Sequence, residues 1–374
     1  MVASIASVPR QGPVDLVLGK SSSTTFSFES FDLPSTNQRI LGAPHPGNTV
    51  APLALRPSSY SNDIKLDEVI QTIKSLQAQD GLLTKKLALH GTLLFRDLPI
   101  HDAEEFSRFA HSFGYKPHEI IGIVVDRPLL APNVAPANES PKEVLIYNHN
   151  ESPQVPHAPE YIFFYSQKAP AKGGETPISS SLELFRRARE EIPDFIDELA
   201  QKGILSKVTY KFDKQYAGGS TLRQAFGKDF SDDDDDEMKR KKITHQIARL
   251  PAIRTQPETD LPTLFTGLAA YWKNKQGAVG SRKEVTRQLY GDGSPIPDKY
   301  LEHLAKITDE ITVLHKWKQG DVLVYDNIIA QHGRHPWEGK QSDRVVLASL
   351  FDGHRIPGAY GDADWAQVVQ ALDG

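Results

Sequence analysis

A histidine and a glutamate two residues apart, His149 and Glu151, have types and spacing that allow metal chemistry. An imidazole and a carboxylate in this H-x-E pattern can converge on one metal ion if they lie at the end of a strand, where the backbone turns. The apolar run from Val144 to Tyr147 predicts that strand. Because two protein ligands seldom suffice to hold a metal, the pattern predicts a third ligand elsewhere in the chain.

His332 is the candidate third ligand. It follows the apolar run from Gly320 to Asn327, which predicts a second buried strand. Two histidines and one carboxylate are the protein ligands typical of non-haem Fe(II) oxygenases, and they leave three positions open on an octahedral metal. An isolated H-x-E pattern recurs by chance, so this interpretation depends on the motifs that accompany it.

Arg344 and Thr176 are candidates for binding a co-substrate. Fe(II) bound on one face needs an electron source to activate oxygen, and a 2-oxo acid supplies two electrons by decarboxylation while it chelates the metal. In a buried site, the distal carboxylate of such an acid needs a cationic, preferably bidentate partner. Arg344 begins the next expected strand after His332, and Thr176 follows the glycine pair Gly173-Gly174. Taken alone, Arg344 would indicate a surface ion pair, and Thr176 would indicate an ordinary turn.

The composition is that of a globular protein with a sizeable core, since 39% of the 374 residues are hydrophobic and 24% are charged. The net charge of -5 gives no electrostatic footprint for nucleic acid. The lack of cysteine excludes a disulfide framework and thiolate metal sites. No apolar run approaches the roughly 18 residues of a membrane span, and Met1 to Lys20 lacks the features of a secretion signal. We therefore expect a cytoplasmic protein without a membrane partner.

The elements that must position these residues indicate a mainly β structure with flanking helices (α+β). Helical periodicity and capping residues predict helices at about 62–80, 102–113, 297–309 and from 181 onward, the last interrupted near Pro193. Apolar runs predict strands at 91–96, 144–147, 161–165, 320–327 and 344–350. Since strands and helices do not alternate regularly, we expect a largely antiparallel sheet structure with helices packed outside, which a double-sheet jelly roll satisfies.

The chain divides into three expected parts. Residues 1–61 are rich in Ser and Pro, which predicts an irregular segment that precedes the core or packs on it. Residues 62–355 form the expected catalytic domain, with a flexible insert at about 210–246, and residues 356–374 form a C-terminal tail. The insert carries an acidic run followed by a basic run at 232–242, which favours a solvated helix or loop over a calcium site.

Five separated motifs together resemble the TauD/TfdA family of Fe(II)/2-oxoglutarate dioxygenases. They are H-N-E at 149–151, G-G-E-T-P-I at 173–178, G-D-V-L-V-Y-D-N at 320–327, H-G-R-H-P-W at 332–337 and R-V-V-L-A-S-L at 344–350. Within that family the chain is most similar to clavaminate-synthase-like proteins, whose metal carboxylate is Glu and which carry a P-A-I segment, here at 251–253. The resemblance implies a double-stranded β-helix of the jelly-roll, cupin-like kind, with the metal at the open mouth of the barrel.

The resemblance also implies roles for single residues. His149, Glu151 and His332 would bind Fe(II), and Thr176 and Arg344 would bind the distal carboxylate of 2-oxoglutarate. O2 would be the other co-substrate.

Two positions depart from the family pattern. The loop from Glu338 to Asp343 is a few residues longer than in similar proteins, so Arg334 is the alternative anchor to Arg344. His335 stands where family members often have Arg, and we interpret it as a structural residue near the ligands, not as a ligand.

Only the class of the substrate follows from the sequence. Candidate lining residues, by their position in the fold, are Asn148, Phe265, Thr266, Gly267 and Arg96, and a structural role for each is an equal alternative. Family members tend to act on small anionic or zwitterionic molecules, so we expect hydroxylation of an unactivated C–H bond in a small carboxylate or amino-acid-like substrate, with release of succinate and CO2. Oxidative cyclisation or desaturation of an amino acid in secondary metabolism is the alternative, and positioning of the substrate decides between them.

Two other classes of function would use the same residues differently. A hydrolase would hold Zn(II) at His149, Glu151 and His332 with a water in the open position, but Thr176 and Arg344 argue against it. A non-catalytic binding protein would keep the barrel alone, and three intact ligands argue against that. A small molecule is the expected partner, and assembly into a homo-oligomer stays open.

Overall fold

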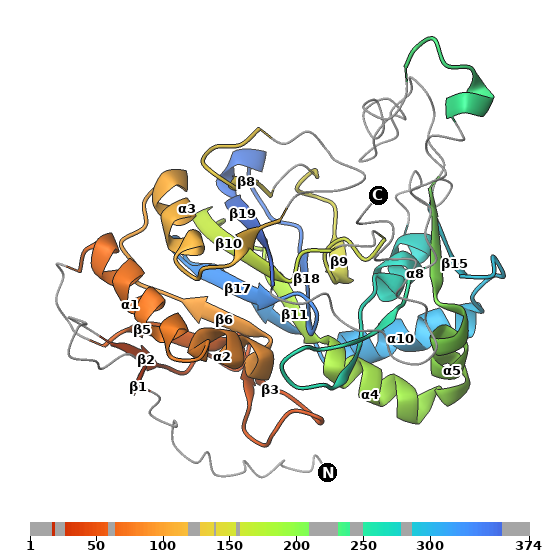
Figure 1. The fold of residues 1–374 in the computed structure, drawn as a ribbon, viewed down its shortest axis with the longest axis horizontal. Coiled ribbons are helices and arrows are strands. Elements are labelled where there is room, and N and C mark those ends of the chain that lie inside the picture. Colours follow the sequence, from red (N-terminus) through yellow and green to blue (C-terminus); the bar gives the residue numbers. More distant parts are fainter. Residues whose placement is uncertain are drawn as a thin grey trace.

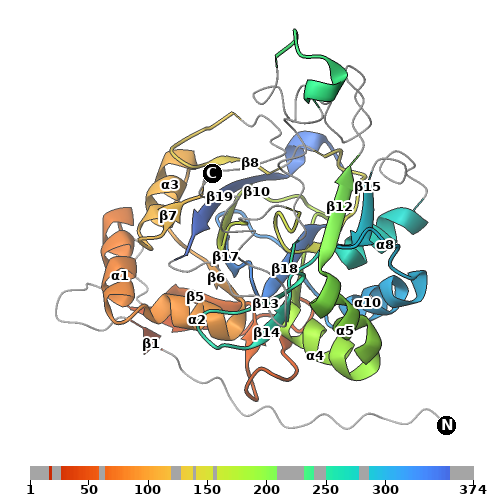
Figure 2. The ribbon, with the colours of Figure 1, turned by 45° about the vertical axis from the view of Figure 1, so that its right-hand side comes forward.

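Two facing sheets with helices on both sides form the body of the protein in the computed structural model (Figures 1 and 2). The structure describes residues 17–18, 27–58, 64–118, 128–137, 140–154, 158–208, 231–239, 250–277 and 286–353. The predicted tail at 356–374 and most of the predicted insert at 210–246 lie outside the described residues.

A nine-stranded sheet forms one wall of the core. In order of pairing, its strands are β1 (Val17–Leu18), β2 (Phe28–Ser30), β5 (Leu53–Pro57), β6 (Thr92–Phe95), β17 (Val322–Asp326), β10 (Tyr161–Lys168), β19 (Val345–Asp352) and β7 (Lys116–Pro117), with β8 (Ala135–Pro136) also beside β19. The central strands β6, β17, β10 and β19 pair antiparallel and are mostly buried. Their apolar runs predict these strands from the sequence.

The N-terminal segment contributes strands to this sheet. β2 pairs with β5, and β5 pairs in parallel with β6, so part of the stretch expected to be irregular is regular structure. Leu53, Ala54 and Leu55 are buried there, and their burial favours pairing despite the nearby Ser and Pro residues. A separate two-stranded sheet joins β3 (Arg39–Ile40) and β4 (Val50–Ala51).

A four-stranded antiparallel sheet forms the opposite wall. Its order is β16 (Val313–His315), β11 (Thr176–Ser180), β18 (Ala330–Arg334) and β9 (Ile146–His149). Side chains of both sheets meet in one apolar cluster, with Ile162 and Leu323 from the large sheet and Ile178 and Ala330 from the small one. The two facing sheets confirm the expected jelly-roll core.

Three helices cover the outer face of the large sheet: α1 (Leu66–Ala78), α2 (Leu82–His90) and α3 (Ala103–His111). The apolar positions that predict α1 are buried, as are Phe106 and Phe109 of α3. Asp102 caps α3 by accepting a hydrogen bond from the Glu105 N–H. The sequence pattern does not predict α2, which begins after Gly81 in the left-handed conformation (φ 64).

A second group of helices lies at the other side of the strands (Figure 1). Its helices are α4 (Ser181–Glu191), α5 (Pro193–Lys202), α8 (Leu268–Gln276) and α10 (Asp298–Glu310). Two small sheets accompany them: β12 (Ile204–Val208) pairs with β15 (Thr286–Tyr290), and β13 (Ile253–Thr255) pairs with β14 (Pro262–Leu264). These elements share their own apolar cluster. Pro193 begins α5, so the predicted interruption of the helix at this residue is confirmed.

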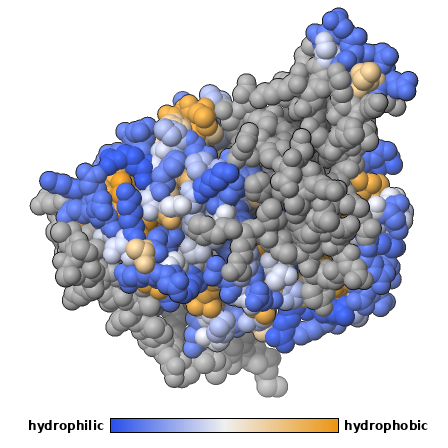
Figure 3. Space-filling view, in the orientation of Figure 1, coloured by the Kyte–Doolittle hydropathy of each residue, from blue (hydrophilic) through white to orange (hydrophobic). Residues whose placement is uncertain are grey.

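The described surface in Figure 3 is mostly hydrophilic, and its apolar side chains form small separate patches. None of the described helices combines the length and apolar character needed to cross a membrane.

Candidate metal centre and co-substrate site

Three potential metal ligands converge where β9 and β18 pair. His149 is the last residue of β9 and lies directly opposite His332 of β18. Glu151 follows two residues later, after the chain has left the strand. One ligand atom from each of the three side chains lies within 4.8 Å of the other two. The structure therefore brings together the residues that the sequence assigns to metal binding.

The distances in this cluster fit one metal ion. Glu151 Oε2 lies 3.3 Å from His332 Nε2, and adjacent ligands of an octahedral metal with bonds of about 2.1 Å lie about 3 Å apart. His149 Nδ1 lies 2.8 Å from the Tyr147 carbonyl oxygen. Because a carbonyl only accepts, Nδ1 donates this bond, and Nε2 keeps its lone pair for a metal. Two imidazoles and one carboxylate are the donor set of a non-haem Fe(II) site.

Aromatic rings hold the His332 side chain. Phe164 and Tyr325 contact it edge-on, with ring centroids at 5.1 and 5.6 Å. His332 Nδ1 is buried, and it has no hydrogen-bond partner among the described residues. Packing therefore fixes the orientation of this imidazole, and the two rings shield it from water.

Two buried asparagines hold the segments that carry the ligands. Asn150, the middle residue of the H-x-E pattern, accepts hydrogen bonds from the Thr266 N–H at 2.9 Å and from the Gln331 side chain at 3.3 Å. Asn327, directly after β17, accepts one from the Glu151 N–H at 2.7 Å. Sequence reasoning missed both roles, although the position of each asparagine beside a ligand or strand end was a usable signal.

Arg344 and Thr176 lie together at the beginnings of β19 and β11. Arg344 Nη2 is 3.4 Å from Thr176 Oγ1, and Arg344 Nε donates to the Gly174 carbonyl oxygen at 3.0 Å. Both side chains are 3% exposed. Burial, with a smaller contribution from the charge of Arg334, lowers the pKa of Arg344 to about 9, so the guanidinium stays cationic at neutral pH. A buried cation beside a hydroxyl matches the needs of a distal carboxylate.

The two positions before Glu175 have no room for a side chain. Gly173 and Gly174 have φ values of +80 and +72. A Cβ on Gly173 would lie 2.4 Å from the Pro336 carbonyl oxygen, and one on Gly174 would lie 3.0 Å from Arg344 Cδ. Gly174 therefore allows Arg344 to approach the strand that carries Thr176, and Gly173 allows the backbone at Pro336 to approach the same turn.

Arg334 has a different, structural environment. Its guanidinium donates to the carbonyl oxygens of Ser140, Pro141 and Val144 at 2.9, 2.8 and 3.0 Å. These bonds attach the segment before β9 to β18, which favours Arg344 over Arg334 as the anchor. His335 follows β18 and is not part of the three-residue metal cluster.

The guanidinium of Arg96 is bound to a carboxylate of the protein itself. Its Nε and Nη2 bind Asp321 Oδ1 and Oδ2 at 2.7 and 2.8 Å, and the two residues are 8% and 0% exposed. This buried bidentate ion pair favours the structural alternative for Arg96 over the substrate-lining role.

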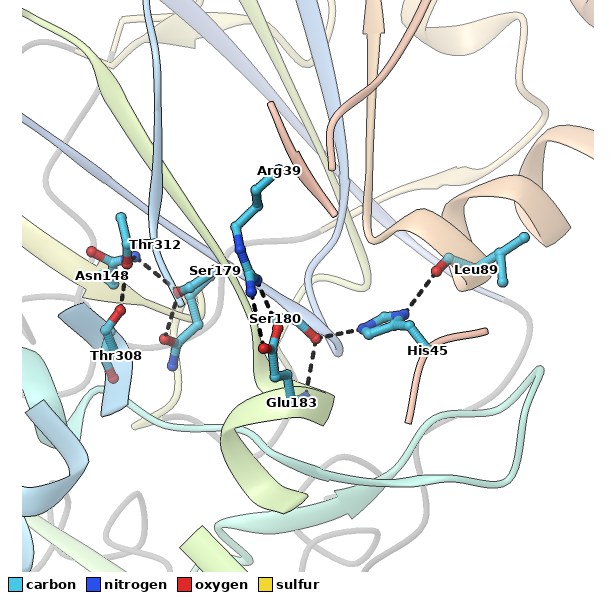
Figure 4. A network of polar contacts seen from close by, with 10 residues as sticks. Arg39, His45, Leu89, Asn148, Ser179, Ser180, Glu183, Thr308 and Thr312 are labelled. Carbon is cyan, nitrogen blue, oxygen red and sulfur yellow. Dashed lines mark hydrogen bonds and ion pairs between the residues drawn. The ribbon is translucent and has the colours of Figure 1, made fainter. Parts of the chain in front are cut away.

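Asn148 is likewise engaged inside the protein. Its amide donates to Ser179 Oγ at 2.8 Å and to Thr312 Oγ1 at 3.1 Å (Figure 4). Thr312 donates in turn to the Thr308 carbonyl oxygen at 2.6 Å. These bonds join β9 to β11 and to the end of α10, and they favour the structural alternative for Asn148 over a substrate contact.

The segment from Phe265 to Gly267 lies beside the metal cluster with its backbone. A Cβ on Gly267 would be 3.8 Å from His149 Cβ. The side chains of Phe265 and Thr266 are buried, and Thr266 Oγ1 accepts a hydrogen bond from the Leu268 N–H at the start of α8. The expected substrate role therefore fits the position of Gly267 better than the side chains of Phe265 and Thr266.

N-terminal residues fix β11, the strand that begins at Thr176 (Figure 4). His45 Nδ1 donates to the Leu89 carbonyl oxygen at 3.0 Å, and its Nε2 lies 2.7 Å from Ser180 Oγ. Burial lowers the pKa of His45, so the ring accepts from the serine as neutral imidazole. Arg39 binds Glu183 with two hydrogen bonds of 2.7 and 3.0 Å. Ser180, the last residue of β11, also caps α4.

A jelly roll that presents two histidines and a carboxylate near a buried arginine defines a class, the non-haem iron oxygenases that use a 2-oxo acid. The model of the taurine catabolism dioxygenase TauD, TfdA family matches residues 56–349, and the chain belongs to this family. Members of the family are Fe(II)/2-oxoglutarate-dependent dioxygenases, so the predicted class of enzyme, metal and co-substrates is confirmed.

Two relatives are similar over most of their length. A clavaminate synthase-like protein of Arabidopsis thaliana is 28% identical over 80% of this chain and 93% of its own. The dapdiamide synthesis protein DdaC of Enterobacter agglomerans is 27% identical over 82% of this chain and 92% of its own. The first agrees with the resemblance to clavaminate-synthase-like proteins.

Solved structures share the fold at low sequence identity. PvcB from Pseudomonas aeruginosa superposes with a TM-score of 0.50 at 14% identity, covering 91% of this chain and 96% of that one. Another structure of PvcB, described as an Fe, alpha-ketoglutarate dependent oxygenase from an isonitrile synthetic pathway, has a TM-score of 0.50 at 15% identity and covers 91% and 97% of the two chains. At these identities the likeness concerns the fold alone.

Proposed function

We propose that this protein oxidises an unactivated C–H bond of a small carboxylate or amino-acid-like substrate at an Fe(II) held by His149, Glu151 and His332. Hydroxylation is the default outcome, with release of succinate and CO2 from 2-oxoglutarate. One observation carries the proposal. The three ligand groups lie within 4.8 Å of one another at the edge of the small sheet that also carries Thr176, and Arg344 adds a buried cation beside that threonine.

The protein side chains have separate tasks in this reaction. Iron(II) and a 2-oxo acid bound together supply the two-electron activation of O2. His149, Glu151 and His332 would hold the iron through two imidazoles and one carboxylate, a donor set that would leave positions free for the co-substrate and O2. The proton on His149 Nδ1 is held at the Tyr147 carbonyl, which keeps Nε2 available as a ligand.

Arg344 and Thr176 bind the end of 2-oxoglutarate that does not chelate the metal. The guanidinium pairs with the distal carboxylate, and the threonine hydroxyl donates a hydrogen bond to it. Because both groups are buried, water competes weakly for the carboxylate, and the ion pair is stronger than it would be at the surface. The same contacts orient the 2-oxo acid toward the metal ligands.

A role in secondary metabolism is supported by one relative. DdaC is a dapdiamide synthesis protein. The second candidate outcome, oxidative cyclisation or desaturation of an amino acid, is compatible with such a role. The outcome depends on how the substrate carbon is held relative to the metal.

Hydrolysis at a Zn(II) ion is a weaker alternative. The same three ligands suit Zn(II) with one bound water. A hydrolase, however, has no use for a buried arginine and hydroxyl that match the distal carboxylate of a 2-oxo acid, and the chain belongs to a dioxygenase family.

The test is anaerobic titration of the Fe(II)-loaded protein with 2-oxoglutarate. We expect the weak visible charge-transfer band of a chelated 2-oxo acid, followed by succinate when oxygen and a panel of amino acids are added. The Glu151→Ala variant is the matched control and should give neither signal. Tight Zn(II) binding without any band in the Fe(II)-loaded wild type would favour the hydrolase instead.

A further inference from the structure

Trp317, three residues before the large-sheet strand motif at Gly320, contacts the threonine of the co-substrate anchor. Its indole Nε1 donates to Thr176 Oγ1 at 2.9 Å. Trp317 is 5% exposed and Thr176 is 3% exposed. β16, which ends two residues before Trp317, pairs with β11 so that His315 lies opposite Thr176. The contact is therefore fixed by strand register as well as by the hydrogen bond.

Two donors approach the same threonine oxygen. Besides the indole N–H, Arg344 Nη2 lies 3.4 Å from Thr176 Oγ1. Indole and guanidinium groups have no acceptor, so both can only donate to this oxygen. Their partial positive charges repel the hydroxyl hydrogen, which must point away from both. Within the described part of the chain, Thr176 Oγ1 has these two bonds and donates none.

We propose that Trp317 is a positioning residue. By donating to Thr176 Oγ1, it orients the threonine hydroxyl so that its hydrogen points toward the distal carboxylate of the co-substrate. The inference rests on the proposed function, because it assumes that this carboxylate binds beside Arg344. A threonine hydroxyl free to rotate would spend part of its time with a lone pair facing the carboxylate. The indole N–H occupies that lone pair in advance, so less orientational freedom is lost on binding.

A buried ion pair holds Trp317 in turn. Asp321 Oδ2 accepts a hydrogen bond from the Lys318 N–H at 2.9 Å and so closes the turn that follows Trp317. Arg96 binds both oxygens of the same carboxylate. The His315 ring stands edge-on to the indole at 5.1 Å, and its Nε2 lies 3.4 Å from Asp321. Arg96, first expected to line the substrate site, thus supports the co-substrate anchor through Asp321 and Trp317.

A purely structural role for Trp317 makes a different prediction. The indole is part of the apolar cluster between the sheets, together with Ile178, Val313 and Tyr325. If packing were its whole contribution, its loss would weaken the binding of every 2-oxo acid alike. If it orients Thr176, only acids with a distal carboxylate are affected.

The decisive experiment is calorimetric titration of the full-length Mn(II)-loaded protein with 2-oxoglutarate and with 2-oxopentanoate, which replaces the distal carboxylate by a methyl group. We expect Trp317→Phe to raise the dissociation constant of 2-oxoglutarate about three- to tenfold, the range for one hydrogen bond. The constant for 2-oxopentanoate should stay unchanged. Tyr165→Phe is the matched control, because it removes a buried aromatic donor to the Ile100 carbonyl oxygen in the helix-facing cluster.

A double-mutant cycle with Thr176→Val tests whether Trp317 affects 2-oxoglutarate binding through the Thr176 hydroxyl. In that background Trp317→Phe should have no further effect on 2-oxoglutarate binding, because the hydroxyl that it orients is gone. An equal effect in both backgrounds, or an equal loss for both acids, would overturn the proposal. Failure of the wild-type protein to bind 2-oxoglutarate would instead overturn the proposed function, so the two failures are distinguishable.

A second measurement leaves Trp317 unchanged, in case the phenylalanine variant does not fold. The indole N–H resonance of Trp317 should move upfield in Thr176→Val, which removes its acceptor, and stay in place in Thr176→Ser, which keeps it. An indole resonance that does not respond to Thr176→Val would contradict the hydrogen bond and with it the inference.

Discussion

His149 and His332 lie directly opposite each other in the antiparallel register of β9 and β18, with ring centroids 4.8 Å apart. Side chains of directly opposed residues on the same face of a sheet point the same way, so the pairing brings both imidazoles to one side of the small sheet. Glu151 approaches from the turn after β9. A metal bound there would join two strands that are far apart in the sequence.

Removing one imidazole should abolish metal binding. His332→Ala takes away a ligand from the middle of a paired strand, where no neighbouring side chain can replace it. We expect Fe(II) affinity to fall by more than about a hundredfold, since even residues that only support metal ligands contribute about ten- to a hundredfold. Metal content after dialysis and succinate formation are the readouts. His101→Ala, at an exposed position, should bind metal normally, and full turnover by His332→Ala would rule out the assignment.

Removing the metal should lower thermal stability. A ligand that binds only the folded state, at about a hundred times its dissociation constant, stabilises it by about 2.7 kcal/mol, which corresponds to a shift of about 3 °C in a chain of this size. Thermal unfolding with excess Mn(II) and with a chelator measures the difference. The Glu151→Ala variant should lose most of the shift. A shift of the same size in that variant would locate the stabilising ion elsewhere.

Substitution of the two candidate anchors, Arg344 and Arg334, should impair different properties of the protein. Arg344→Ala removes the buried cation beside Thr176, and the dissociation constant of 2-oxoglutarate should rise at least about thirtyfold, as for one partner of a buried charge pair. Arg334→Ala leaves three carbonyl oxygens without their donor and should chiefly lower the free energy of unfolding. Co-substrate binding and denaturant unfolding of both variants are the measurements. The reverse pattern would move the anchor to Arg334.

The members of the candidate metal cluster could be predicted from the sequence because their signal is local. Each histidine ends or follows an apolar run, and apolar runs of this length form buried strands whose ends meet at an edge of the core. The glycine pair before Thr176 is a second local feature, and in the structure its positive φ values allow a close approach that side chains would block.

The partners of buried polar side chains could not be predicted. Arg96 and Asp321 are separated by 225 positions, and nothing in the local sequence of either residue indicates the other. From the sequence alone, Arg96 is therefore a candidate substrate contact, whereas in the structure its charge is paired with that of Asp321. The sequence pattern also does not predict helix α2, although its buried Leu83 and Leu87 stand four residues apart, because the helix is short and packing against the large sheet stabilises it.

Glu160 should make stability depend on pH. The pKa of Glu160 is raised from 4.5 to about 8, chiefly by burial and to a smaller extent by the negative charges of Asp326 and Asp352. Because the folded state holds the proton more tightly than the unfolded chain, this group's contribution to stability is complete below about pH 4.5 and is lost as the pH rises toward 8. Glu160→Gln keeps the shape of the protonated acid, so it should match the wild type near pH 4.5 and be more stable at pH 8. Thermal unfolding across this range measures the difference. Glu302→Gln, at an exposed position of α10, should follow the wild type throughout, and a Glu160→Gln variant with the wild-type pH profile would contradict the raised pKa.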